Sequence, residues 1–371
     1  MPANSNKLVK KKILWQAHEG NISGANLAML EYIDVLQNEF DFSVILPHEG
    51  SMKQALVKRK IPFFVIRQYG WANKYHWWAF GKWMKILLRS FKAITQTFRL
   101  IKKSAPDIVF TNTLVPFTTS VAAKMTRRPH VWWIHEFGKE DFGFKIGWGN
   151  EKRAFKWMQS SSQLIIGNSR AISSKFSNLM PKVKIETIYQ PVSWQKRETK
   201  DSVKKARFLM FGQLIGSKGH KDVIEAIKAC KEMEKKLPTL HILGPSENSE
   251  YLKELNELVQ KNKLQNYVHI EIGYFNKEEV MPQYEVLIVA SQSEAFGRVI
   301  IEANKAGLHV LVRNSGGSPE LINASNGVLF NNQNELIAAL SGEKLFPDST
   351  IRMNYNESLE VEKITELLYS L

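Results

Sequence analysis

The sequence predicts an α/β protein made of two doubly wound, Rossmann-like domains. The chain has 371 residues, which is longer than a single hydrophobic core usually grows. Hydrophobic residues make up 44% of it, so a packed globular structure is expected. In each half, short apolar runs alternate with amphipathic stretches, a pattern typical of parallel strands joined by crossover helices.

Twelve short apolar runs are predicted to be strands. Six lie in the first half: 12–16, 42–47, 63–67, 107–112, 130–136 and 163–169. Six lie in the second half: 207–212, 239–244, 268–273, 286–291, 309–314 and 327–330. The polar segment 190–206 between the halves lacks both the helix and the strand period, so we expect the linker there. This gives domains over 1–190 and 191–351, followed by a helix over about 352–371 that packs back on the first domain.

The charge of the chain is unevenly distributed. Residues 1–200 hold 32 Lys/Arg and 13 Asp/Glu, whereas residues 201–371 hold 19 and 23, within a net charge of +15. The asymmetry indicates an anionic partner for the first half, either a nucleic acid or a membrane face. The only cysteine, Cys230, excludes a disulfide framework and favours a reducing, cytoplasmic setting. No signal-peptide pattern or spanning apolar stretch is present.

The stretch SEAFGRVIIEANKAG (293–307) carries the strongest pattern of the second half. It follows a predicted strand and is expected to open a helix whose Val299, Ala303 and Ala306 form the buried face. A helix N-terminus favours anions, so the amides near Gly297, Arg298 and Val299 are candidates to hold phosphates.

Two glutamates bracket this helix start. Glu294 lies in the loop before the helix, and Glu302 lies about a turn and a half inside it. From these places Glu294 can reach the sugar end of a ligand and Glu302 can accept ribose hydroxyls. The alternative is that Glu294 caps the helix and Glu302 is a solvated helical residue.

A second anion-binding element is predicted where the first strand of the same half ends. The stretch FGQLIGSKGHKDVIEAI (211–227) reads as a strand, a glycine-bearing loop and a helix. Lys218 in this loop can neutralise a diphosphate as a point charge, although a surface lysine would give the same pattern.

With these motifs in place, the sequence resembles the retaining nucleotide-sugar glycosyltransferases of family 4, which have the GT-B fold. The resemblance is carried by EAFGRVIIE, by GQLIGSKG, by NSGGSPELI (314–322) and by IIGNSRAISSKF (165–176). It implies that the second domain binds the donor, with Glu294 by the sugar, Glu302 on the ribose and Lys218 on the diphosphate. The family also implies a UDP-hexose as the commonest donor and neither a metal nor another cofactor.

One position departs from the family pattern. Gln213 stands where the family commonly has an arginine, which removes a positive charge from the phosphate site. Either Lys218 and the helix amides suffice, or Arg298 compensates, or turnover is weakened. This departure keeps open the alternative that the chain is a binding protein that has lost glycosyl-transfer activity. A GT-B enzyme of another reaction class is a separate alternative.

The first domain offers weaker signals. Gly20, in a glycine-bearing loop after the first strand, is placed near the donor phosphates by the resemblance, whereas helix capping by Asn21 or Ser23 is the simpler alternative. His135 ends a strand where the family often has a histidine close to the transferred sugar. His18 and Glu19 are candidate acceptor-side groups, with Glu19 as a possible base.

The segment 67–103 suggests where the acceptor lies. It holds nine Lys/Arg and no Asp/Glu, and apolar residues recur in it at helical spacing. Such a composition suits an anionic bilayer, whereas nucleic acid is disfavoured because no nucleic-acid-binding motif accompanies the charge. The alternative is a core-facing helix with a solvated basic back. The expected membrane contacts are Trp71, Trp77, Trp78, Trp83, Lys82, Lys85 and Arg89.

By analogy, the expected acceptor is a lipid-linked glycan of a bacterial envelope polysaccharide. The expected location is the inner face of the plasma membrane, with the enzyme bound peripherally.

Overall fold

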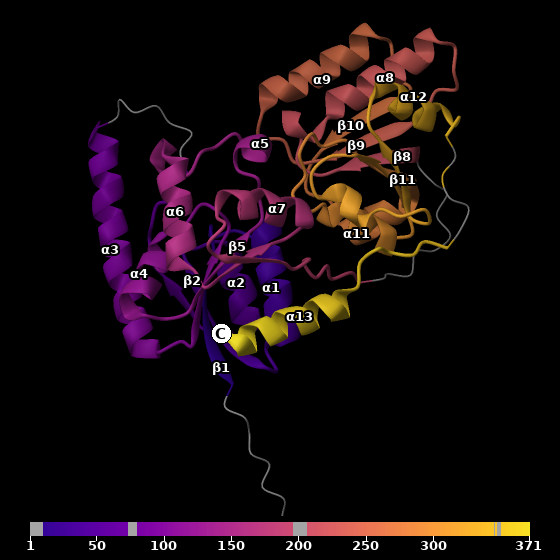
Figure 1. Ribbon diagram of the computed structural model, residues 1–371. Coiled ribbons are helices and arrows are strands. Elements are labelled where there is room, and N and C mark those ends of the chain that lie inside the picture. Colours follow the sequence, from indigo (N-terminus) through magenta and orange to yellow (C-terminus); the bar gives the residue numbers. More distant parts are fainter. Residues whose placement is uncertain (1–9, 73–79, 196–205, 345, 347–349) are drawn as a thin grey trace, which may run out of the picture. The chain divides into compact units, whose positions relative to one another are not determined.

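The computed structural model describes residues 10–72, 80–195, 206–344, 346 and 350–371 (Figure 1). The chain forms two compact units, Met1–Pro191 together with Glu357–Leu371, and Val192–Asn356. Each unit contains a parallel sheet flanked by helices, so the predicted fold class is confirmed.

The sheet of the first unit has seven strands in the order β3-β2-β1-β4-β5-β6-β7, all parallel. The strands are β1 (Lys11–Gln16), β2 (Phe40–Leu46), β3 (Phe63–Val65), β4 (Ile108–Asn112), β5 (His130–Ile134), β6 (Leu164–Gly167) and β7 (Lys184–Thr187). The helices are α1 (Gly24–Leu36), α2 (Ser51–Lys58), α3 (Phe80–Ser104), α4 (Thr118–Thr126), α5 (Lys139–Phe142), α6 (Glu151–Ser161), α7 (Arg170–Leu179) and α13 (Glu357–Ser370).

The two faces of this sheet bury alternate residues of each strand. Ile13 and Trp15 of β1 pack in one core with residues of α1, α2 and α13. Leu14 packs in a second core with residues of α3 and α4. This alternation follows from the period of two in a strand, and it explains why strands covered on both faces are almost continuously apolar.

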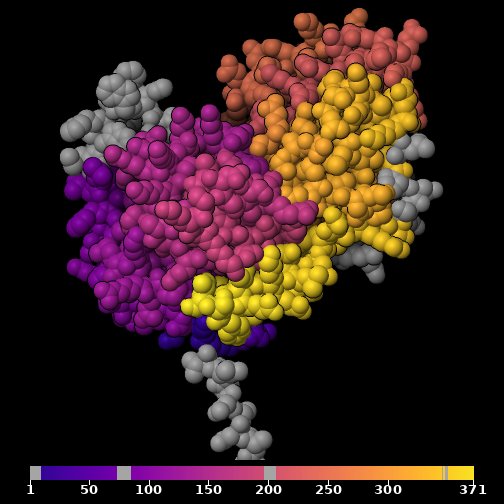
Figure 2. All heavy atoms as spheres, viewed as in Figure 1, coloured from indigo at the N-terminus to yellow at the C-terminus, as the bar shows by residue number. Residues whose placement is uncertain are grey.

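The C-terminal helix α13 belongs to the first unit. Ile364 and Leu368 are buried in the core that contains α1. The Nζ of Lys11 donates a hydrogen bond to the carbonyl of Tyr369 over 2.8 Å. Figure 2 shows this helix, in yellow, lying on the surface of the first unit.

The sheet of the second unit has six parallel strands in the order β10-β9-β8-β11-β12-β13. The strands are β8 (Ala206–Phe211), β9 (Leu240–Gly244), β10 (Val268–Ile272), β11 (Tyr284–Val289), β12 (His309–Arg313) and β13 (Gly327–Phe330). The helices are α8 (His220–Glu232), α9 (Ser249–Lys261), α10 (Lys277–Val280), α11 (Arg298–Lys305) and α12 (Gln333–Ser341). Helices α8, α9 and α12 cover one face, and α11 packs beside β11 and β12.

All twelve predicted strands are present, whereas β7 was not predicted. Its four residues, KIET, lie at the sheet edge and are mostly half-exposed, so they carry little apolar signal.

The predicted buried face of α11 is only partly correct, because Ala303 is buried but Val299 and Ala306 are half-exposed. The helix is short, and its neighbours bury Ile300 and Ile301 instead. Of the predicted linker, residues 196–205 lie outside the described residues.

Candidate functional site

The carboxyl ends of β8 and β11 form the switch point of the second sheet. These two strands are neighbours, and the strand order runs outward from them in opposite directions. Ligands of open parallel sheets bind in the crevice beyond the strand ends at such a point. The loops 212–219 and 290–297, which carry the strongest sequence motifs, therefore flank the expected ligand crevice.

Two glycines bring three loops into close contact there. A Cβ on Gly219, whose φ is +73°, would lie 2.2 Å from the carbonyl oxygen of Ala290. A Cβ on Gly316, whose φ is +62°, would lie 2.3 Å from the carbonyl oxygen of Glu294. The backbone of Gly317 then donates to that same oxygen over 2.7 Å. Only glycine fits such approaches without strain.

Lys218 and Glu294 meet in this crevice. The Nζ of Lys218 lies 2.7 Å from the Oε2 of Glu294, and the hydroxyl of Ser291 donates to the same oxygen over 3.0 Å. Both side chains remain partly exposed. Gln213 follows β8, and its side chain is exposed. The structure therefore brings together the two side chains predicted to read the diphosphate and the sugar.

The N-terminus of α11 opens into the same loops. The N-cap is Gly297, with φ +91° and no side-chain capping hydrogen bond, whereas the Oε2 of Glu294 contacts Lys218 and Ser291. Ser318 lies beside Gly297 and is 1% exposed. Its hydroxyl has no hydrogen-bond partner among the described residues. An uncapped helix N-terminus beside a buried, unsatisfied hydroxyl can accommodate an anion. Sequence reasoning flagged this loop but not Ser318.

Glu302 is buried and paired, which excludes its alternative role as a solvated helical residue. It is 6% exposed, and its Oε1 forms an ion pair with Lys277. The Nη2 of Arg298 lies 3.9 Å from that oxygen. Sequence reasoning missed Lys277, because no motif marks it and its proximity to Glu302 depends on the strand order.

The first unit gathers polar side chains beyond β1. The ring of His18 contacts Asn26 Oδ1 at 3.1 Å through Nδ1 and Glu19 Oε1 at 3.0 Å through Nε2. The hydrogen bond from His18 lowers the pKa of Glu19 below its ordinary value. The backbone N–H of Gly20 donates to His48 Nε2 over 3.3 Å.

Helix capping accounts for part of this loop. Ser23 occupies the N-cap of α1, but its side chain makes no capping hydrogen bond. The Oδ1 of Asn21 accepts from the backbone N–H of Ser51, the first residue of α2, over 3.3 Å, so Asn21 caps the start of that helix.

His135 follows β5 and is held by a buried carboxylate. Its backbone N–H donates to Glu136 Oε2 over 3.1 Å, and the N–H of Leu114 donates to Oε1 over 2.6 Å. Burial raises the pKa of Glu136 to about 7, although both hydrogen bonds and His18 act in the opposite direction. The ring of His135 stacks on Trp133 and lies 2.8 Å from the side-chain nitrogen of Gln190.

Helix α3 exposes apolar side chains among basic ones. Leu87, Leu88 and Phe91 are 49%, 63% and 72% exposed, and the nearby Lys85 and Arg89 are exposed as well. Another side of the helix packs in the core through residues such as Ala93 and Ile101. Among the described helices, none is both long and apolar enough to cross a bilayer.

Trp71 is not available to a membrane surface, contrary to the sequence-based expectation. It is 5% exposed and stacks on Phe117 and Trp132, with ring centroids 5.1 and 5.7 Å away. Its indole N–H donates to the carbonyl of Leu114 over 2.7 Å. The sequence could not distinguish this internal anchor from its neighbours. Trp77 and Trp78, and the side chains of Lys82 and Trp83, lie outside the described residues.

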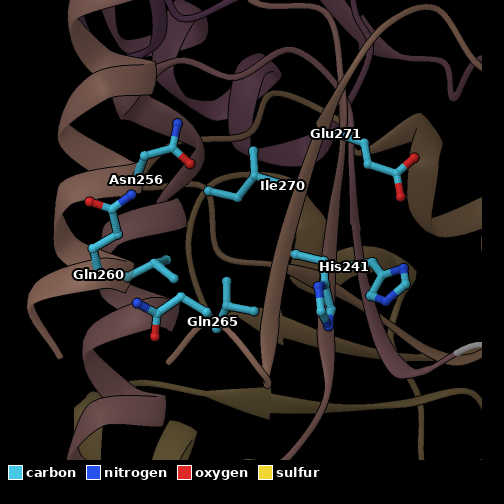
Figure 3. A pocket seen from close by; sticks show the side chains of 9 residues that line it. His241, Asn256, Gln260, Gln265, Ile270 and Glu271 are labelled. Carbon is cyan, nitrogen blue, oxygen red and sulfur yellow. The ribbon is translucent and has the colours of Figure 1, made fainter. Parts of the chain in front are cut away.

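A separate pocket of about 530 Å³ lies along β9, β10 and α9 (Figure 3). Its lining includes His241, Asn256, Gln260 and Glu271. His241 is the second residue of β9, so this part of the pocket lies toward the amino ends of the strands, away from the switch point. Within the described ranges, no cluster of three or more His, Cys, Asp or Glu side chains could hold a metal ion.

Comparison with known families identifies both halves of the chain. The family described as glycosyl transferases group 1 matches residues 193–357, and Glycosyltransferase Family 4 matches residues 23–195. A curated relative is the GtfA subunit of a UDP-N-acetylglucosamine–peptide N-acetylglucosaminyltransferase from Streptococcus agalactiae. It is 31% identical over 137 residues, which cover 37% of this chain and only 26% of the relative.

Solved structures share the fold over almost the whole chain. A glycosyltransferase from Rickettsia africae has a TM-score of 0.76 at 18% identity, covering 98% of this chain and 99% of that one. HepE from Anabaena, in complex with UDP-glucose, has a TM-score of 0.72 at 20% identity, covering 97% and 100%. Taken together with the two matched families, these likenesses place the chain among the family 4-type glycosyltransferases with the GT-B fold.

Proposed function

We propose that this glycosyltransferase moves a hexose from a nucleoside diphosphate sugar, preferably a UDP-hexose, to a hydroxyl of a lipid-linked glycan with retention of anomeric configuration. The observation that carries the proposal is the Lys218–Glu294 pair beside the uncapped start of α11 and the unsatisfied hydroxyl of Ser318. A cation, a helix N-terminus and a hydroxyl suit a diphosphate, and a carboxylate suits sugar hydroxyls.

The proposed chemistry follows from where charge develops. Breaking the sugar–phosphate bond builds negative charge on the leaving diphosphate and positive charge at the anomeric carbon. Lys218 and the first amides of α11, near Gly297, Arg298 and Val299, stabilise the leaving group, so the proposal needs no metal ion. Glu294 orients the donor sugar, and Glu302 accepts hydroxyls of the ribose.

The first unit supplies the acceptor side in this proposal. We assign His135 to the transferred sugar and the loop around Gly20 to the donor phosphates and acceptor. The hydrogen bond between His18 and Glu19 holds the glutamate ionised, which makes Glu19 a weak base.

The test is transfer of radiolabelled hexose from UDP-glucose, UDP-galactose and UDP-N-acetylglucosamine into a lipid extract. Glu294→Gln is expected to abolish transfer while the protein still binds UDP in a thermal-shift assay. Glu257→Gln, on the exposed side of α9, serves as the matched control and should keep wild-type transfer. Unchanged transfer by Glu294→Gln would refute the assignment. Binding of UDP without transfer by the wild type would favour a binding protein whose Gln213 marks lost turnover.

We further propose that the exposed face of α3 places the enzyme on an anionic membrane, peripherally at the cytoplasmic face where envelope polysaccharides are built. The charge complementarity supports this, since residues 80–104 contain seven Lys/Arg and no Asp/Glu. Leu88→Asp and Phe91→Asp are expected to reduce sedimentation with phosphatidylglycerol vesicles. Leu179→Asp, a similarly exposed leucine on α7, should not. Equal sedimentation of all variants, or of the wild type with neutral vesicles, would contradict the proposal.

A further inference from the structure

Lys277 belongs to a segment that reaches across the carboxyl edge of the second sheet. It opens α10, which follows β10, whereas Glu302 lies on α11, which follows β11. The strand order β10-β9-β8-β11 separates these strands by three positions. The ion pair between Lys277 and Glu302 therefore joins the outermost strand's loop to the helix at the switch point.

This ion pair makes the two oxygens of Glu302 unequal. Oε1 is held by Lys277, with Arg298 3.9 Å away. The hydrogen bond and the ion-pair distances of Glu302 all end on Oε1, and no hydrogen bond to Oε2 is found in the part of the chain that the structure describes. A buried carboxylate is stable only when paired, so Lys277 fixes the rotamer of Glu302 and leaves one defined oxygen as an acceptor.

We propose that Lys277 is a positioning residue that aims Glu302 at the ribose, and that the pair makes the donor site selective for ribonucleotides over 2′-deoxyribonucleotides. This rests on the proposed donor role of Glu302. An ionised carboxylate only accepts hydrogen bonds, and a ribose diol donates two. A 2′-deoxy nucleotide leaves the aimed oxygen of Glu302 without one donor in a desolvated place, which costs more than the missing contact alone.

The experiment measures dissociation constants calorimetrically for UDP, GDP and ADP and for the 2′-deoxy form of each. For the wild type, the 2′-deoxy form of the tightest binder is expected to bind about 10- to 100-fold more weakly. The ratio of the dissociation constant of the 2′-deoxy form to that of the ribonucleotide should fall below about 3-fold in Lys277→Met. Lys277→Arg should restore most of this ratio. Lys253→Met, an exposed lysine on α9, is the control and should keep the wild-type ratio.

A second comparison tests whether Lys277 acts through Glu302. Glu302→Gln should also lose the ratio, and adding Lys277→Met to it should change nothing further, since residues that act as a unit are not additive. The melting temperature of each ligand-free variant shows that it is folded.

Two results would overturn the inference in different ways. Tight nucleotide binding by folded Lys277→Met with the wild-type ratio would remove the role of Lys277 but leave the donor site standing. Failure of the wild type to bind any of the six nucleotides would remove the donor site itself, and the role of Lys277 with it.

Discussion

Two buried groups of the first unit are expected to give opposite pH dependences of stability. Burial raises the pKa of Glu136 to about 7 from 4.5 and lowers that of His130 to about 3 from 6.5. Between pH 4.5 and 7, folded Glu136 keeps a proton that the unfolded chain releases, so the free energy of unfolding falls as pH rises. Between pH 3 and 6.5, unfolded His130 binds a proton that the folded chain excludes, so the free energy of unfolding rises with pH.

The sizes of the two effects follow from the shifts at about 1.4 kcal/mol per pH unit. As pH rises through its window, Glu136 lowers the free energy of unfolding by about 3 kcal/mol. His130 raises the free energy of unfolding by about 5 kcal/mol across its own window. Between about pH 5 and 6 the two slopes oppose each other and largely cancel. Glu136→Gln removes the falling slope, so the free energy of unfolding should then rise by about 1 kcal/mol per pH unit in this range.

The assay is guanidinium unfolding at several pH values between 4.5 and 6.5, followed by tryptophan fluorescence. Nine of the ten tryptophans lie in the sequence of the first unit, so the signal reports mainly on it. Glu140→Gln, an exposed carboxylate of the same loop region, is the control and should keep the wild-type slope. If Glu136→Gln also keeps that slope, the argument that burial controls Glu136 is refuted.

Three further predictions concern single side chains. Trp71→Ala should lower the free energy of unfolding by about 3–5 kcal/mol in the same assay, because a buried, stacked indole is removed. Trp71→Phe should lower the free energy of unfolding by less than Trp71→Ala does. Gly316→Ala should destabilise by more than about 1 kcal/mol and weaken nucleotide binding in calorimetry, because its Cβ would clash with the backbone of Glu294 at φ +62°. Lys218→Met should reduce hexose transfer about 100-fold or more while the protein stays folded, and an unchanged rate would contradict its place on the leaving group.

The fold was largely predictable because buried parallel strands leave a strong apolar signal. Runs such as 286–291 are apolar on both faces, and all twelve of these predicted runs form strands. The edge strand β7 was not predicted because only one of its four residues, Ile185, is aliphatic, so the segment has no periodic apolar pattern. The start of α11 was predictable from Gly297, whose positive φ ends the preceding loop.

The proposed donor site was predictable only where sequence motifs end on adjacent strands. Lys218 and Glu294 follow β8 and β11, and a doubly wound order makes these two strands neighbours. Lys277 follows β10, and only the full strand order and the path of its loop bring it to Glu302. Ser318 was also not predicted as a site residue. Its unsatisfied hydroxyl results from tertiary packing, which the spacing of residues in the sequence does not show.

Trp71 connects the segment that precedes α3 to His135 through hydrogen bonds inside the first unit. Its indole donates to the carbonyl of Leu114, the N–H of Leu114 donates to Glu136, and Glu136 also accepts from the N–H of His135. Trp71→Ala removes the first of these bonds and should therefore disturb the surroundings of His135, whereas Leu88→Asp on the exposed side of α3 should not. The imidazole resonances of His135 in NMR spectra measure this difference. A shift caused by Leu88→Asp and not by Trp71→Ala would show that the coupling runs through α3 itself rather than through the buried tryptophan.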